Sequence, residues 1–400
     1  MKAIARMEHA GIPLQSDRLL TLRRKWPDLH DALIARVDQA YHVFEGGSFR
    51  RERWEHWTAR QGIAWPRLAS GQLALDKQTF RDMSRAYPQV NPMRELRASL
   101  SELRLEALAV GHDGRNRCLL SPFGSRTGRN SPSNTKFIFG PATWIRHLIT
   151  PEPGHGLAYL DWSAQEIGIA GILSGDTALQ DAYQSGDPYL RFAQQAGAVP
   201  PTATKASHGA LRDLYKTVML GTNYGLSEVG LATRLQLSRL EARELLAAHK
   251  RTYRQYWRWV DGVRDYAYLH RRLSTTFGWT LHVEDTSNPR SVGNFPLQAN
   301  GAEMLRIALC LATEQGVEVC APVHDGVLIH APLPDLADAV ALMQSCMQQA
   351  SAVVLEGFVL RTEASVWRYP EHYSDPRGTA MWHTVWSIIE GDRDSKRDAL

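Results

Sequence analysis

The amino-acid sequence predicts an α+β fold, in which long helical segments separate a few short apolar strands. Helices are predicted because apolar residues recur at helical spacing through much of residues 1–110 and 165–270. Strands are predicted by an apolar run, 156–160, that ends in a carboxylate, and by two apolar runs on either side of 324–326. Because these strands lie far apart in the sequence, helical segments must be inserted between strands that meet in space.

The composition is ordinary for a soluble globular protein, with 44% hydrophobic and 22% charged residues. The 400 residues are enough for two or three core-forming units, and the net charge of +4 permits an anionic partner. The 4 cysteines form no CxxC pair, which argues against a zinc site or a disulfide framework and favours a reducing, cytoplasmic location. The N-terminus lacks the apolar core of a signal peptide and no run is long enough to span a bilayer, so we expect no membrane association.

Three segments need separate comment. Residues 45–75 are rich in Arg, Trp and Gly and are predicted to form a loop. The periodic stretch that follows carries Arg94, Arg97 and Arg104 on one face, which is either solvated or in contact with phosphate. A further helix is predicted to start near Pro296, because proline suits a first helical turn.

The first candidate site is the end of the strand that starts near residue 156. Asp161 ends this strand, and Glu166 lies five residues on, early in a predicted helix. A carboxylate at a strand end beside a helix start can face a cleft and bind a hard cation. The same position is typical of a helix N-cap or a turn former, and Asp161 alone does not decide between them.

The second candidate site is a row of residues on a predicted helix. Arg212, Lys216, Leu220 and Tyr224 recur every four residues and therefore form one slowly winding row. Two cations at one end and an aromatic ring at the other suit the phosphates and the base of a nucleoside triphosphate. The alternative is a basic amphipathic helix at the surface.

The third candidate site is the predicted hairpin at His324-Asp325-Gly326. An Asp-Gly pair between apolar runs is typical of a hairpin turn. Asp325 at the tip, together with Asp161 at another strand end, could bring two carboxylates to one place. A pair of Mg²⁺ ions that clamps an in-line displacement at phosphorus needs shared carboxylates of this kind, whereas the alternative is an Asp-Gly turn with no ion.

Taken in order, these segments resemble the three signature motifs of the family A DNA polymerases. The family's D-Y-S-Q-I-E-L-R, which continues to L-S-G-D, is similar to D-W-S-A-Q-E-I-G and the later 173–176; its R-x3-K-x3-F-x3-Y-G is similar to 212–225, and its V-H-D-E to 323–326. Further matches are T-G-R at 127–129, and Arg290, Asn294, Pro296 and Gln298 ahead of the hairpin. The start, M-E-H-A-G-I, is similar to the family's entry to the thumb, so the resemblance covers nearly the whole chain.

The resemblance implies a metal-dependent nucleotidyl transfer. Asp161 and Asp325 would hold two Mg²⁺ ions, for which Mn²⁺ can substitute, and the backbone carbonyl of Trp162 would complete one coordination shell. Arg212 and Lys216 would bind the triphosphate, and Lys216 would also protonate the departing pyrophosphate.

The resemblance also implies contacts to the nucleotide and to DNA. Tyr224 would lie beside the nascent base pair, and Glu166 would occupy the place of a ribose 2′-hydroxyl, which favours deoxynucleotides. The residues expected to contact the primer–template, largely through the minor groove and the sugars near the primer end, are Arg129, Arg290, Asn294, Gln298 and His324. Such contacts test duplex shape and not sequence.

Five positions depart from the family pattern. Leu220 replaces an aromatic residue under the incoming sugar, and Tyr189 stands where a His commonly reaches the phosphates. Gly326 replaces an accessory Glu after the metal-binding Asp. Ala164 stands for Gln and Gly168 for Arg. Both metal-binding aspartates are kept, so we expect an active enzyme.

The expected architecture is the right-hand polymerase fold, with an antiparallel-sheet palm, helical fingers and a helical thumb. We predict the thumb at 1–120, the first part of the palm at 121–175, the fingers at 176–280, and the second part of the palm with a C-terminal extension at 281–400. The extension past Trp367 favours a phage- or plasmid-type member.

The predicted function is template-directed DNA synthesis in replication or repair, by a monomer that extends primer–template DNA with deoxynucleoside triphosphates. No D-x-E sequence occurs in the 400 residues, so we expect no proofreading exonuclease within them. Two alternatives stay open. One is a single-subunit RNA polymerase, against which Glu166 argues. The other is a catalytically degenerate DNA-binding replication accessory protein.

Overall fold

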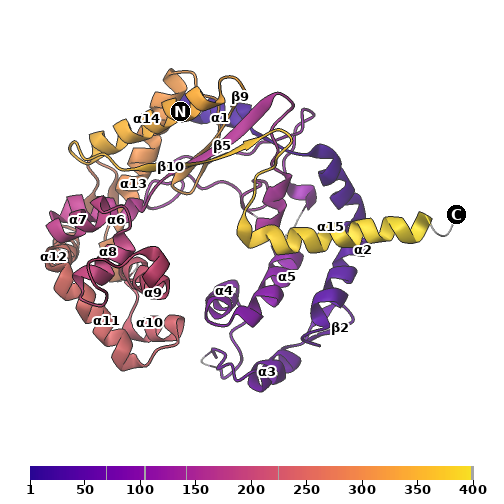
Figure 1. The fold of residues 1–400 in the computed structure, drawn as a ribbon, viewed down its shortest axis with the longest axis horizontal. Coiled ribbons are helices and arrows are strands. Elements are labelled where there is room, and N and C mark those ends of the chain that lie inside the picture. Colours follow the sequence, from indigo (N-terminus) through magenta and orange to yellow (C-terminus); the bar gives the residue numbers. More distant parts are fainter. Residues whose placement is uncertain (69, 103–104, 141, 224, 398–400) are drawn as a thin grey trace. The chain divides into compact units, whose positions relative to one another are not determined.

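The computed structural model describes residues 1–68, 70–102, 105–140, 142–223 and 225–397 (Figure 1). The chain divides into two compact units. The first, called here the sheet unit, consists of Met1–Met7, Leu120–Ser131 and Ala158–Val366. The second, called the helical unit, consists of Glu8–Leu119, Pro132–Leu157 and Trp367–Leu400. The predicted α+β class is confirmed, whereas the thumb, palm and fingers boundaries stay predictions.

A four-stranded sheet is the centre of the sheet unit, and its strand order is β10-β5-β9-β8. The strands are β5 (His155–Trp162), β8 (Val319–Val323), β9 (Gly326–Pro332) and β10 (Thr362–Arg368). Nearly every residue of β8 and β9 is buried, as expected for strands covered on both faces. In β5, by contrast, Tyr159 and Asp161 are less buried than Leu160 and Trp162, so successive side chains point to different environments.

Backbone hydrogen bonds fix the register of β5 against β10. The Ser163 N–H donates to the Arg361 carbonyl at 2.9 Å, and the Tyr369 N–H donates to the His155 carbonyl at 3.1 Å. The higher-numbered residue at β5 thus pairs with the lower-numbered residue at β10, and the lower with the higher, so the two strands are antiparallel. The register places Asp161 directly opposite Glu363.

The hairpin predicted around Asp325 is confirmed, but its turn lies one residue earlier than expected. β8 pairs antiparallel with β9, and Val323 pairs with Gly326. The two turn residues are therefore His324 and Asp325, and His324 adopts the positive φ of 57° that such a turn requires. Gly326 is instead the first residue of β9, where a Cβ atom would lie 2.5 Å from the Tyr159 hydroxyl and 2.7 Å from the Leu160 carbonyl oxygen. Glycine stands here because the neighbouring strand comes too close for a side chain.

Between β5 and the strand that starts at Arg272, the described residues form a series of helices. They are α6 (Gln165–Ser174), α7 (Thr177–Gln184), α8 (Pro188–Gln195), α9 (Lys205–Asn223), α10 (Glu228–Leu235), α11 (Arg239–Thr252) and α12 (Arg254–His270). Several begin at a capping side chain, as Asp176 accepts from Ala178 and Leu179 at the start of α7. The core of this group contains His249, which is 1% exposed, among Phe192 and Tyr253.

The predicted start of the long helix before the hairpin is wrong. The helix α13 (Pro289–Glu314) begins seven residues earlier than Pro296, which lies inside it. The Asn288 side chain accepts from the Arg290 N–H at 2.9 Å and so caps the helix, and Pro289 takes the first position. Most of α13 is buried, and it packs against α14 (Leu336–Val354).

A small hairpin, β6 (Arg272–Ser274) and β7 (Thr280–His282), is bound to α13 through its turn. The buried Glu303 of α13 accepts from the Thr275 hydroxyl and, at 3.2 Å, from the Phe277 N–H. Asn300, one turn earlier on α13, accepts from the Thr276 N–H at 3.2 Å. The polar backbone of the turn is thereby satisfied against the helix.

The described part of the helical unit is built from helices, two short strand pairs and isolated β-bridges. Its helices are α2 (Ser16–Asp38), α3 (Arg51–Arg60), α4 (Lys77–Ala86), α5 (Asn91–Glu102), α15 (Pro376–Arg397) and the 3₁₀ turns η1 (Pro88–Val90), η2 (Leu105–Ala107) and η3 (Thr143–Leu148). Its short strands are β1 (Ile12–Pro13), which pairs with β4 (Arg115–Asn116), and β2 (Phe44–Glu45), which pairs with β3 (Ser48–Phe49). Leu14 bridges to Ile149. α15 packs against α2 and η3.

The loop predicted over 45–75 is wrong in part, because it contains α3. Trp54 and Trp57, three residues apart on α3, are both buried and stack with ring centroids 4.9 Å apart. Trp65 meets Trp54 edge to face at 5.0 Å. This aromatic cluster buries a large apolar area, which stabilises a helix whose sequence is otherwise highly charged.

Arg97, on the predicted basic face, packs against aromatic rings. Its guanidinium lies 4.4 Å from the ring centroid of Phe49 and 4.6 Å from that of Phe80. It also donates to the Leu75 carbonyl at 3.1 Å. The side chain is therefore only partly exposed and is not simply solvated, whereas the alternative of a phosphate contact stays a prediction. Arg104 lies outside the described residues.

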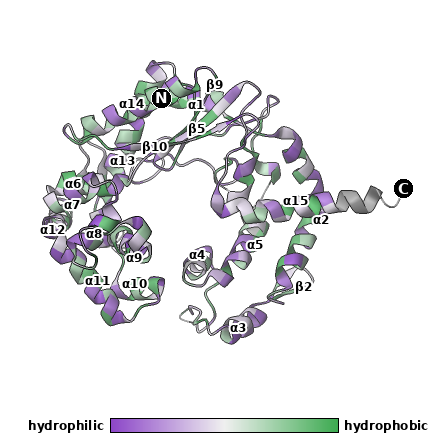
Figure 2. Ribbon diagram, in the orientation of Figure 1, coloured by the Kyte–Doolittle hydropathy of each residue, from purple (hydrophilic) through white to green (hydrophobic). Residues whose placement is uncertain are grey.

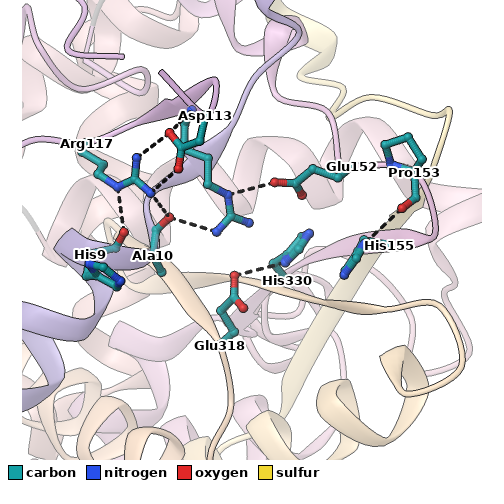
Figure 3. A network of polar contacts seen from close by, with 10 residues as sticks. His9, Ala10, Asp113, Arg117, Glu152, Pro153, His155, Glu318 and His330 are labelled. Atoms are coloured by element: carbon teal, nitrogen blue, oxygen red, sulfur yellow. Dashed lines mark hydrogen bonds and ion pairs between the residues drawn. The ribbon is translucent and has the colours of Figure 1, made fainter. Parts of the chain in front are cut away.

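Hydrogen bonds and ion pairs join the first residues of the helical unit to residues 113–117 (Figure 3). Arg117 donates to both carboxylate oxygens of Asp113, at 2.7 and 2.6 Å, and to the carbonyl of His9 at 2.7 Å. These hydrogen bonds hold the pKa of Asp113 well below its usual range. Arg115 donates to the Ala10 carbonyl at 2.9 Å. Two arginines thus bind the last carbonyl groups of α1 (Lys2–Ala10), where a positive charge is favourable.

Hydrophobic and hydrophilic residues are interleaved along most helices in Figure 2, as expected for helices with one buried face. Across the part of the chain that the structure describes, no helix combines the length and the apolar character needed to cross a membrane.

The stability of the protein should fall in mild acid because of His249. Trp257 Nε1–H donates to His249 Nδ1 at 3.0 Å, so the neutral ring carries its proton on Nε2, which faces the Thr222 hydroxyl at 3.2 Å. Burial lowers the pKa of His249 to about 3, whereas the unfolded value is near 6.5. The unfolded chain therefore binds more protons between these values, and this group should remove roughly 1.4 kcal/mol of stability per pH unit as the pH falls through that window.

Urea unfolding at pH 7.5 and pH 5 would measure this effect. His249→Gln should reduce the difference between the two pH values, while His282→Gln, at an exposed position of β7, should leave it unchanged. An equal pH dependence in all three proteins would contradict the role of His249.

Adding a side chain at residue 326 should destabilise the sheet. Gly326→Ala should lower the free energy of unfolding by about 1–3 kcal/mol, because the new methyl group has no room between Tyr159 and Leu160. Gly262→Ala is the matched control, since a Cβ at this helical glycine meets nothing within 4 Å. Urea unfolding of both variants would check this, and a Gly326→Ala protein as stable as the parent would show that the strands can separate.

Candidate active site

The carboxylates of Asp161, Asp325 and Glu363 come from three neighbouring strands or their ends. Asp161 is in β5, Asp325 directly precedes β9 on one side, and Glu363 is in β10 on the other. Burial, and then the negative charges of Glu363 and Asp325, raise the pKa of Asp161 to about 6. Each neighbouring carboxylate is therefore close enough to oppose ionisation of Asp161. The fold thus brings together the two aspartates singled out in the sequence.

Arg129 supplies the cation of this group. One guanidinium nitrogen donates to Asp325 Oδ1 at 2.5 Å, and the other donates to Gln298 Oε1 at 3.1 Å. Both side chains of the ion pair are only partly exposed, at 24% and 34%. The guanidinium therefore offsets part of the negative charge at Asp325, and the aligned hydrogen bond fixes its direction.

A further hydrogen bond links Gln298 to Glu166. Gln298 Nε2 donates to Glu166 Oε1 at 3.4 Å, so Arg129, Gln298 and Glu166 form one chain of polar contacts. Asn294 lies one turn before Gln298 on α13, and both line a pocket with Arg126, Thr127 and the apolar side chains of Leu281 and Phe295. The Asn294 Oδ1 atom is buried without a hydrogen-bond partner, which is costly unless a ligand supplies a donor. These predicted DNA contacts therefore lie along one face of α13.

The start of α9 carries the predicted phosphate-binding cations. Arg212 Nε donates to Asp187 Oδ2 at 2.5 Å, and Arg212 also pairs with Asp213 at 2.9 Å. The Tyr189 ring lies 5.2 Å from the guanidinium of Arg212 and 5.2 Å from the ammonium of Lys216. The face of the Tyr189 ring attracts both cations, so a cation–π contact joins the two side chains at this position.

The remaining predicted residues occupy several places in the sheet unit. Leu220 is half-buried on α9, four residues beyond Lys216, and Tyr224 lies outside the described residues. Arg290 is exposed at the start of α13, and its side-chain stem lies against Gly225, directly after the α9 segment. Trp162 is buried, and its indole donates to the Met347 carbonyl at 3.2 Å, while His324 is exposed in the hairpin turn.

Two residues of the site were missed in the sequence. Glu363 joins Asp161 only through strand pairing, and the Ser163 hydroxyl donates to it at 2.6 Å. Asp187 carries two contacts, because it caps α8 through the Leu190 N–H and also binds Arg212. An Asp before a Pro is typical of a helix start, so the sequence signal for Asp187 was that of a cap alone.

The departure at Gly168 also has a steric cause. A Cβ atom at this buried helical position would collide with the Leu360 side chain and lie 3.1 Å from the Tyr183 ring. The arginine that is usual in the family does not fit unless both neighbours move.

The donor set suits hard divalent cations. Carboxylate and carbonyl oxygens are the ligands that Mg²⁺ prefers. Burial, and then the negative charges of Glu363 and Asp325, disfavour ionisation of Asp161, and a bound cation would oppose both effects. Within the described ranges, no three His, Cys, Asp or Glu side chains converge at metal-binding distance.

Comparison with known proteins shows the family to which the chain belongs. The family model of DNA polymerase family A matches residues 77–366. DNA polymerase I of Chloroflexus aurantiacus is 26% identical over 382 residues, which are 87% of this chain and 40% of that protein. The DNA polymerase of Mycobacterium phage L5 is 26% identical over 251 residues, 61% of this chain and 40% of that protein. The chain thus spans 40% of the length of these relatives.

Among solved structures, the chain is similar to the POL domain of Pol1 from M. smegmatis, in complex with DNA primer-template and dNTP. The TM-score is 0.72 and the identity 22%, over 91% of this chain and 68% of that one. This likeness confirms the predicted polymerase fold. Since the family model also matches well over half of the residues, the chain belongs to DNA polymerase family A.

Proposed function

We propose that this protein is a template-directed DNA polymerase, which extends a primer with deoxynucleoside triphosphates. The observation that carries this proposal is the meeting of Asp161 and Asp325 on neighbouring strands of one sheet. Family membership supports it, and so does the complex of the M. smegmatis relative with DNA primer-template and dNTP.

Asp161 and Asp325, with the carbonyl of Trp162, would hold the divalent cations. Two Mg²⁺ ions, when bound, would activate the primer 3′-hydroxyl and neutralise the leaving pyrophosphate. The carboxylates supply fixed charge at the point where the new phosphodiester forms. Their partial burial lowers the local dielectric constant, which strengthens charge interactions at that point.

The cations of α9 would bind the triphosphate. Arg212 is already bound to an anion, the carboxylate of Asp187, at the place where phosphate oxygens would arrive. A triphosphate carries more charge than one carboxylate and can replace it at Arg212. Lys216 lies one helical turn further on, and its ammonium can give a proton to the departing pyrophosphate. Leu220 presents no ring to the sugar, so we expect slower turnover than in relatives with an aromatic residue.

The primer–template would lie along the polar face of α13. Arg129, Asn294 and Gln298 present donors and acceptors that suit the minor-groove edges of paired bases, which are nearly alike for every correct pair. Arg290 and His324 would contact sugars or phosphates nearby. We also propose that these 400 residues hold no proofreading site, since they contain no D-x-E sequence.

Removing the charge of either aspartate should abolish extension. Asp161→Asn or Asp325→Asn should reduce primer extension by about 100- to 1,000-fold or more, because a preorganised charge at the reacting phosphate is lost. Asp335→Asn, an exposed carboxylate at the start of α14, is the matched control and should extend normally. Primer extension and primer–template binding should be measured together. A wild-type protein that binds primer–template but never extends it would identify a degenerate scaffold.

Truncating Glu166 should relax the choice of sugar. Glu166→Ala should increase incorporation of ribonucleotides relative to deoxynucleotides by roughly 10-fold or more, because the side chain would no longer exclude a 2′-hydroxyl. Single-nucleotide insertion with each nucleotide type checks this. If the wild-type protein prefers ribonucleotides, the chain is an RNA polymerase instead.

A further inference from the structure

Arg129 stands at the end of a tight turn, residues 125–129, which is called here the Arg129 turn. The turn is closed by its own hydrogen bonds. The Gly128 N–H donates to the Ser125 carbonyl at 3.0 Å, and the Arg129 N–H donates to the Ser125 hydroxyl at 2.9 Å. These bonds lie within the turn and set its shape, but they do not set its position relative to the neighbouring elements.

Apolar packing does not hold the turn from behind. A cavity of about 90 Å³ lies beside Gly128 and Arg129, between the start of α1 and the helix α13. The walls opposite the turn are apolar and include Leu305 and Leu309. Empty space next to a loop gives no dispersion contacts on that side, so other groups must position the loop.

Trp279 is the first of these groups. Its indole N–H donates to the Arg126 carbonyl at 3.0 Å, and its ring stacks on Phe123, with centroids 5.3 Å apart and an angle of 24°. Trp279 itself packs against the buried cluster that contains Leu281 and Phe295. One side chain thus joins the Arg129 turn to a rigid core.

Arg306 of α13 is the second group. It donates to the Gly128 carbonyl at 2.8 Å, and its guanidinium lies 4.2 Å from the ring centroid of Phe123. Gly128 has a φ of +76°, and a Cβ there would lie 3.2 Å from Arg306 and 3.3 Å from Trp279. Glycine at this position therefore lets both side chains reach the backbone of the turn.

We propose that Trp279 and Arg306 are positioning residues that act through Arg129, by holding its guanidinium between Asp325 and Gln298. This inference rests on the proposed function. While no DNA is bound, the guanidinium competes with divalent cations for Asp325. When a primer is bound, the same guanidinium is presented to the primer end. Trp279 and Arg306 thereby couple the metal affinity of Asp325 to the fit of the primer terminus.

The first test measures Mn²⁺ affinity without DNA, from the electron paramagnetic resonance signal of free Mn²⁺. Arg129→Ala should bind Mn²⁺ about 10-fold more tightly than the wild type, since a competing cation has been removed. Trp279→Ala should give a shift in the same direction. In the Arg129→Ala background, Trp279→Ala should add nothing, because both changes act on one guanidinium. Additive shifts would overturn the inference, since they require a path that bypasses Arg129.

The second test compares matched and mismatched primer ends. Trp279→Ala and Arg306→Gln should lower kcat on a matched primer about 10-fold and leave the KM for the nucleotide unchanged, because Arg212 and Lys216 are untouched. The preference for a matched over a mismatched end should shrink in both variants. An unchanged preference would overturn the inference.

Two control variants separate positioning from general stability. Trp279→Phe keeps the stack on Phe123 but loses the hydrogen bond to Arg126, and it should recover part of the matched-end preference. Phe277→Leu, on the same hairpin with a side chain 57% exposed, should behave as wild type in both tests. If Phe277→Leu shows the full effect, the hairpin as a whole is responsible and Trp279 is not.

Because the Mn²⁺ measurement needs no synthesis, failure of this inference is distinct from failure of the proposed function. A wild-type protein that extends primers, with Trp279→Ala unchanged in Mn²⁺ affinity, overturns the positioning role alone. A wild-type protein that extends no primer overturns the polymerase activity, whatever the Mn²⁺ result.

Discussion

Burial of a carboxylate beside two others is the constraint to which the rest of the site responds. Asp161 lies between Asp325 and Glu363, and burial, followed by these two negative charges, raises its pKa to about 6. The apolar side of the sheet and the buried strands β8 and β9 supply the burial that holds these charges together. Arg129 offsets the charge of Asp325, and the Ser163 hydroxyl binds Glu363. A divalent cation bound beside Asp161 would favour its ionised form and so oppose the effect of burial.

A second group of charges, on α9, is positive and is held by other contacts. Arg212 and Lys216 lie near each other, and an acid and a ring keep them in place. Asp187 neutralises Arg212, and Tyr189 offers its face to both cations. The cations are therefore preorganised before any phosphate arrives, which reduces the ordering that nucleotide binding requires.

Local signals in the sequence were sufficient for the fold class, the strand that carries Asp161 and the hairpin at Asp325, because periodicity and turn residues act over a few positions. They failed where distant contacts decide. The segment around Trp54 resembles a loop until its aromatic partners are known, and Pro296 lies within a helix because Asn288 caps the chain earlier. Glu363 and Asp187 were missed for the same reason, since strand register and an ion pair across 25 residues leave no local pattern.

The close approach of β5 to Gly326 has a consequence for any side chain introduced there. The Tyr159 hydroxyl and the Leu160 carbonyl fill the space that its first carbon would need. The family pattern that this chain resembles has a glutamate at this position, and a Gly326→Glu change would meet both barriers. A smaller residue at 159 would remove only one of them, because the Leu160 carbonyl belongs to the backbone, so β5 itself would have to move before an acid could be accommodated.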